Sequence, residues 1–193
     1  MTTVIDTFEK FVLSPRATVE SVVRERRYGA AFAGYLLAVL GFYFWSEAGG
    51  TGISIGGFAF GVAWRFTLAI LKGLLYAAFV HMTLSFLKQK GSAAGLFILI
   101  GISASVFALL LPLSLISELA GRYGFGLHWL VLFITAALQF VLLVELVKIS
   151  YNTTPAKAWT ALLAPVVFWI LVVFAVIVSL AVALFLAAAF FVA

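Results

Sequence analysis

The stretch from Ala93 to Ser117 reads AAGLFILIGISASVFALLLPLSLIS and contains no charged or histidine side chain. A helix needs about 20 apolar residues to cross the roughly 30 Å hydrocarbon core of a bilayer, so this stretch is long enough to span a membrane. Four further long runs of mostly apolar residues flank it, at residues 28–45, 65–87, 127–147 and 165–191. The sequence therefore predicts five membrane-spanning segments.

The composition of the chain agrees with a membrane protein. Apolar residue types make up 65% of the 193 residues, 10% are charged, and the mean hydropathy is +1.23. Soluble domains are closer to half apolar and a quarter charged. Continuous apolar runs indicate helices, because a membrane barrel shows segments of about ten residues with alternating hydrophobicity. We therefore expect an all-α, polytopic transmembrane helical bundle over residues 28–193, preceded by short amphipathic interfacial helices.

Positive charge predicts the orientation of the five spans. Lys and Arg concentrate in the cytoplasmic segments of membrane proteins. With a cytoplasmic N-terminus, only Arg122 lies in an outer loop, and the C-terminus is outside. The nine basic residues on the cytoplasmic side are then Lys10, Arg16, Arg24, Arg26, Arg27, Lys88, Lys90, Lys148 and Lys157.

Aromatic residues support the same orientation. Trp45, Trp64, Tyr123 and Trp129 fall at the outer boundary, and Tyr28, Tyr151 and Trp159 fall at the inner one, as expected of aromatic belts. The net charge of +5 then indicates contact with anionic lipid at the inner face and not nucleic-acid binding.

Residues 1–27 are predicted to form a cytoplasmic amphipathic segment. The segment lacks the pattern of a cleaved signal peptide, so we expect the mature chain to keep it. Apolar residues recur at helical spacing from Val4 to Val12, and Ser14-Pro15 can begin a second helix that ends near Arg24. Two short helices lying in the interface are one interpretation, and an ordinary positive-inside anchor for the first span is the other. The candidate lipid-headgroup contacts are Arg16, Arg24, Arg26 and Arg27.

Residues 49–61 contain six glycines, so the sequence does not determine where the second span starts. The segment can extend the second span outward or form a re-entrant turn. An irregular outer loop is the interpretation that we favour, because glycine gains the most from irregular backbone.

Polar and ionisable side chains at membrane depth mark candidate sites, because they are costly in lipid. One interpretation is a set of satisfied pairs: Arg65 with Glu118, His81 with Glu145, and Lys72 with Gln139, a carbonyl or a serine. The other is a proton or ion path in which His81 and Glu145 titrate. The candidate buried polar or ion-path residues are Arg65, Lys72, His81, Glu118, Gln139 and Glu145.

No enzyme motif is present in the sequence. His81 and His128 do not form the H-E-x-x-H pattern, there is no cysteine, and neither a G-x-S-x-G elbow nor a phosphate-binding loop occurs. We therefore expect no catalytic residue, no cofactor and no metal site.

The layout resembles the Yip family (Ypt/Rab-interacting proteins), in particular its small prokaryotic members. The resemblance rests on Leu13-Ser14-Pro15-Arg16, on His81 followed by Ser85-Phe86-Leu87, on Lys88-Gln89-Lys90-Gly91-Ser92 and on Tyr151 to Ala158. It implies five spans, a cytoplasmic N-terminus and a prokaryotic inner membrane. The long acidic cytoplasmic domain of the eukaryotic members has no counterpart here, so the resemblance does not extend to binding of a small GTPase.

Two classes of function follow from the sequence. The first is a non-enzymatic membrane scaffold or organiser, whose partners are the lipid bilayer, further copies of the chain or other membrane proteins. The second is a small transporter or channel subunit that uses Arg65, Lys72, His81 and Glu145. The arrangement of these four side chains distinguishes the two classes.

Overall fold

The computed structural model describes residues 15–47, 55–119 and 124–192, and these residues are helical except at short turns. In chain order the elements are α2 (Pro15–Arg24), α3 (Tyr28–Glu47), α4 (Ile55–Phe86), α5 (Ala93–Ala104), the 3₁₀ helix η1 (Ser105–Leu109), α6 (Leu110–Leu119), α7 (Gly124–Tyr151) and α8 (Pro155–Val192). Five helical stretches are long and apolar enough to cross a membrane: α3, α4, the α5–η1–α6 rod, α7 and α8. The all-α fold class is thus confirmed, and the chain is an integral membrane protein.

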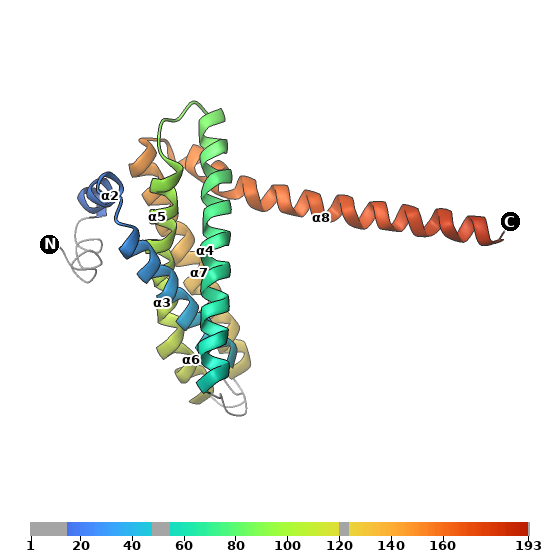
Figure 1. The fold of residues 1–193 in the computed structure, drawn as a ribbon, viewed down its shortest axis with the longest axis horizontal. Coiled ribbons are helices and arrows are strands. Elements are labelled where there is room, and N and C mark those ends of the chain that lie inside the picture. The colour runs from blue at the N-terminus through green and yellow to red at the C-terminus, as the bar shows by residue number, and fades with distance from the viewer. Residues whose placement is uncertain (1–14, 48–54, 120–123, 193) are drawn as a thin grey trace.

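Helices α3 to α7 form an upright bundle with two chemically different ends (Figure 1). At one end α3 and α5 begin and α4 and α7 end. We call this the basic end, because it carries Arg24, Arg26, Arg27, Lys88, Lys90, Lys148 and Lys157. The opposite end, where α3 and α6 end and α4 and α7 begin, is the distal end.

The α5–η1–α6 rod is the central element of the bundle. Every residue of α5 from Gly95 to Ala104 is buried, and the rod contacts both α3 and α7 along its length. The α-helical pattern is interrupted by η1, just before Pro112. Proline has no amide hydrogen and its ring clashes with the carbonyl four residues earlier, so the turn that precedes Pro112 tightens.

Glycine allows α3 and the rod to approach until their backbones touch. A Cβ atom at Gly34 would collide with the carbonyl oxygen of Gly101, and one at Gly41 would collide with that of Phe107. Gly34 and Gly41 are seven residues apart and therefore share one face of α3. This interface leaves no room for a larger side chain at either position.

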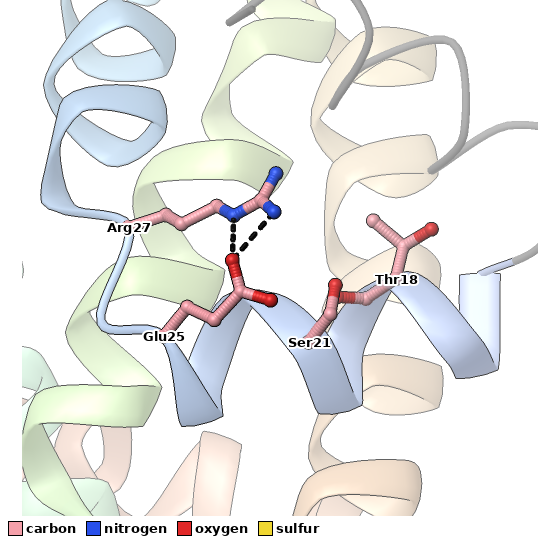
Figure 2. Close-up of polar contacts among 4 residues, drawn as sticks. All are labelled: Thr18, Ser21, Glu25 and Arg27. Carbon is pink, nitrogen blue, oxygen red and sulfur yellow. Dashed lines mark hydrogen bonds and ion pairs between the residues drawn. The ribbon is translucent and has the colours of Figure 1, made fainter. Parts of the chain in front are cut away.

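Helix α2 begins at Pro15, where the sequence predicts a helix start, and it runs across α5 and α7 near the basic end (Figure 2). Its Val19 and Val22 are 1% exposed and pack in one cluster with Ile98 and Leu146. In the turn that follows, the Arg27 guanidinium folds back onto Glu25, with Nε and Nη2 at 2.8 and 2.6 Å from the same carboxylate oxygen. The predicted first helix, from Val4 to Val12, lies outside the described residues.

Two spans begin earlier than the sequence suggests. Helix α4 begins at Ile55, so residues 55–61 are helical, contrary to the favoured loop interpretation, and residues 48–54 lie outside the described part. Helix α8 begins at Pro155 and contains Pro165 in its interior, where a span was expected to start. A hydropathy run detects lipid-compatible residues, whereas a helix continues as long as its backbone hydrogen bonds do.

The largest departure from the predicted five-span bundle is α8. Its first turns are held by the bundle, with Ala158, Ala161 and Leu162 fully buried. From Val166 onward every described residue except Val172 is exposed, and the helix extends far from the bundle, crosswise to α4 (Figure 1). Apolar composition predicts a span but not its packing, because lipid solvates an apolar helix as well as protein does.

Candidate functional site

Arg65 finds its partners on α3 at the distal end. Its Nη1 donates to Ser46 Oγ at 2.9 Å, its Nη2 lies 3.4 Å from Glu47 Oε1, and its guanidinium carbon lies 4.7 Å from the centre of the Tyr43 ring. The side chains of Arg65 and Glu47 are 38% and 39% exposed, so the ion pair belongs to the surface. The expected partner, Glu118, has a side chain outside the described part of the structure.

His81 bonds to a tyrosine and not to a carboxylate. Its Nδ1 lies 2.8 Å from Tyr151 Oη, which links the last turns of α4 to the last residue of α7. Tyr151 is 3% exposed, and Gly91, in the turn between α4 and α5, leaves space for its ring, since a Cβ at Gly91 would overlap it. The predicted pair of His81 with Glu145 is therefore wrong.

Glu145 lies on the outer surface of α7 instead. Its two carboxylate oxygens accept bonds of 2.9 and 2.8 Å from Lys148 Nζ, three residues further along the same helix. The Glu145 side chain is 54% exposed. Glu145 lies six residues, about 9 Å, before Tyr151 along α7, so it is not level with His81, which bonds to Tyr151.

Gln139 points into the bundle and bonds to the third span. Its Nε2 donates to Ser103 Oγ at 3.3 Å, and Ser103 is fully buried. The predicted bond between Gln139 and Lys72 is therefore not formed. A serine in an otherwise apolar run supplies the acceptor.

Lys72 is exposed on α4, contrary to its prediction as a buried residue. Within residues 15–47, 55–119 and 124–192 it makes no hydrogen bond or ion pair. Arg65 and Lys72 share a face of α4, as their spacing of seven predicts. That face contacts α3 at Arg65 but is open at Lys72.

The candidate residues thus occupy separate places. Arg65 lies at the distal end, His81 at the basic end, Glu145 on the outer surface of α7, and Lys72 on the outer surface of α4. The described residues hold no group of three or more His, Cys, Asp or Glu that could bind a metal ion. The arrangement does not bring the four side chains to one path.

Three tyrosines in the bundle, Tyr35, Tyr76 and Tyr151, make hydrogen bonds between helices that the sequence did not single out as sites. Besides Tyr151, Tyr76 donates its hydroxyl proton to the carbonyl oxygen of Leu162 at 2.7 Å and so ties α4 to α8. Tyr151 was identified only as an inner-boundary aromatic residue. The only signal in the sequence was a tyrosine inside or beside a long apolar run.

The distal end carries a compact aromatic contact. The Trp45 ring stacks on His128 with 4.4 Å between centroids, and Trp45 Nε1 donates to the His128 carbonyl oxygen at 3.4 Å. Trp129 meets Trp45 edge-on at 5.3 Å. These contacts join the end of α3 to the start of α7, at the boundary where the sequence predicts an aromatic belt.

No protein-family model, curated protein or solved structure matches this chain.

Proposed function

We propose that this integral membrane protein is a non-enzymatic scaffold or organiser that acts through its helical surfaces. The observation that carries the proposal is the dispersal of the ionisable side chains. Arg65, His81 and Glu145 each have a local partner, and Lys72 faces outward. A transport path needs polar groups that converge on one cavity or follow one another through the bundle.

The packing of the bundle interior supports the same proposal. Backbone contact at Gly34 and Gly41 closes the space between α3 and the central rod. The buried cluster that contains Leu84, Leu96 and Val147 fills the bundle between α4, α5 and α7 with apolar side chains. Close apolar packing of this kind favours a stable platform over a hydrated passage.

A C-terminus outside is not part of the proposed orientation, because α8 begins at the basic end and runs crosswise to the bundle (Figure 1). The proposed orientation places the basic end in the cytoplasm and the N-terminus on the same side. It rests on the positive-inside rule, with Lys88, Lys90, Lys148 and Lys157 all at that end of the bundle. Family membership is likewise proposed from the Yip resemblance, and the location in a prokaryotic inner membrane follows from it. No small-GTPase partner is proposed.

A flux assay tests the scaffold proposal. Purified protein is reconstituted into liposomes, and proton, potassium and small-solute fluxes are compared with those of protein-free liposomes. We expect the same flux in both, because the ionisable groups do not form a path. A protein-dependent flux that is lost in H81A and retained in the matched surface variant K88A would replace the scaffold with a transporter.

Single-cysteine labelling tests the orientation, and the absence of native cysteine makes it direct. Lys90→Cys lies in the turn between α4 and α5, and Gly56→Cys lies in the first turn of α4 with no atom within 4 Å of its new Cβ. In intact cells whose outer face is accessible, a membrane-impermeant maleimide is expected to label Gly56→Cys. Lys90→Cys is expected to react only after permeabilisation. The reverse pattern would invert the topology.

A further inference from the structure

Lys72 lies near the middle of α4, the second candidate span. Counted along α4 at 1.5 Å per residue, it is about 25 Å from the start of the helix at Ile55 and about 21 Å from its end at Phe86. The hydrocarbon core is about 30 Å thick, so a position more than about 20 Å from both ends of α4 falls inside the core when the helix crosses the bilayer. The lysine side chain is exposed there, on a helix whose lipid-facing neighbours Leu71 and Leu75 are 52% and 53% exposed.

The face of α4 that carries Lys72 is covered on one side and open on the other. Phe79, seven residues nearer the basic end and on the same face, packs against Phe168 of α8 with 5.5 Å between ring centroids. Beyond this contact α8 leaves the bundle (Figure 1). Lys72 is therefore the next position on a face that already binds a helix and that α8 does not continue to cover.

No acidic residue in the described part of the chain forms an ion pair with Lys72. The nearest in depth, Glu145, lies on the outer surface of α7 and is already paired with Lys148. The others lie before the first span or at the distal end: Asp6, Glu9, Glu20, Glu25, Glu47 and Glu118. A second copy of the chain in a symmetric pairing would bring one Lys72 towards another, so it does not supply the missing negative charge. The exposed part of α8 does not supply it either, because its only polar side chain is Ser179.

We propose that the α4 face around Lys72 docks a transmembrane helix of another membrane protein that carries an aspartate or glutamate at the depth of Lys72. The inference names the partner class for the proposed scaffold and rests on that function. A carboxylate at this depth satisfies a charge that is costly to leave alone in hydrocarbon. Because lipid gives apolar helices no reason to associate, such a polar contact determines which helix binds and at what register.

A defined peptide probe tests the docking. The full-length chain carries a fluorescent donor on Gly56→Cys and is reconstituted at low density in liposomes. The acceptor is attached to a synthetic polyleucine transmembrane helix with one glutamate at its centre. We expect energy transfer to reveal association roughly tenfold tighter than for the same peptide with glutamine, a difference of about 1.4 kcal/mol. K72R is expected to keep the preference and K72L to remove it, while K88L, at the basic end, keeps it.

A depth series makes the test independent of any substitution in the chain. Moving the glutamate four residues in either direction shifts it by about 6 Å and is expected to weaken association. Equal binding of the glutamate and glutamine peptides, or binding that K72L leaves unchanged, would overturn the docking site. The flux assay separates the two proposals, because a docking failure without protein-dependent flux leaves the scaffold function standing.

Discussion

Gly34→Leu is expected to separate α3 from the central rod and to destabilise the protein by about 3 kcal/mol or more. Overpacking a core costs about 1–3 kcal/mol when side chains can move aside. Here the atom in the way is the carbonyl oxygen of Gly101, which belongs to the backbone of a buried helix and cannot rotate out of the way. Thermal unfolding of the detergent-solubilised protein, followed by circular dichroism, measures the loss.

The same helix provides the matched control. Gly29 is also in α3, and a Cβ at this position meets no atom within 4 Å. Gly29→Leu should therefore melt at or near the melting temperature of the unmodified protein. The melting temperature of Gly34→Ala should lie between those of the unmodified protein and Gly34→Leu. Equal melting temperatures for Gly29→Leu and Gly34→Leu would mean that α3 and the rod are not in backbone contact.

Much of the fold could be predicted because the bilayer imposes it. A chain with long uncharged runs such as residues 93–117 must satisfy its backbone internally, and this requirement alone selects helices. The start of α2 followed from Pro15, whose fixed backbone angle suits the first helical turn. The departure of α8 could not be predicted in this way, since Val166 and its neighbours are equally well solvated by lipid and by other helices.

For the candidate residues, the sequence predicts the position along a helix better than the direction in which the side chain points. Position along a span predicted that His81 and Glu145 would lie near one end of the bundle. Their rotation about the helix axes depends on which faces α4 and α7 present to each other, and that is a property of the packed core. His81 bonds to Tyr151, and Glu145 bonds to Lys148 three residues away, because these are the polar side chains within reach on the helix faces where His81 and Glu145 lie.

Contacts with the bundle, and not lipid headgroups, are expected to hold α2 in place. A ten-residue helix is too short to be stable on its own in water. Val19 and Val22 are 1% exposed against α5 and α7, so a carboxylate at either position would be buried without a partner. The double substitution V19D/V22D is therefore expected to raise amide hydrogen exchange in residues 15–24 by at least about tenfold. Mass spectrometry of the protein in lipid nanodiscs measures the exchange.

The basic residues of the same segment give the opposing test. Arg24 and Arg26 are exposed and are predicted to contact lipid headgroups. If the valine contacts hold α2, R24Q/R26Q leaves exchange in residues 15–24 unchanged in nanodiscs that contain anionic lipid. Each basic residue near such a surface contributes about 1 kcal/mol, so a helix held by headgroups would loosen in R24Q/R26Q. Fast exchange in R24Q/R26Q together with protected amides in V19D/V22D would show that lipid, and not the bundle, anchors α2.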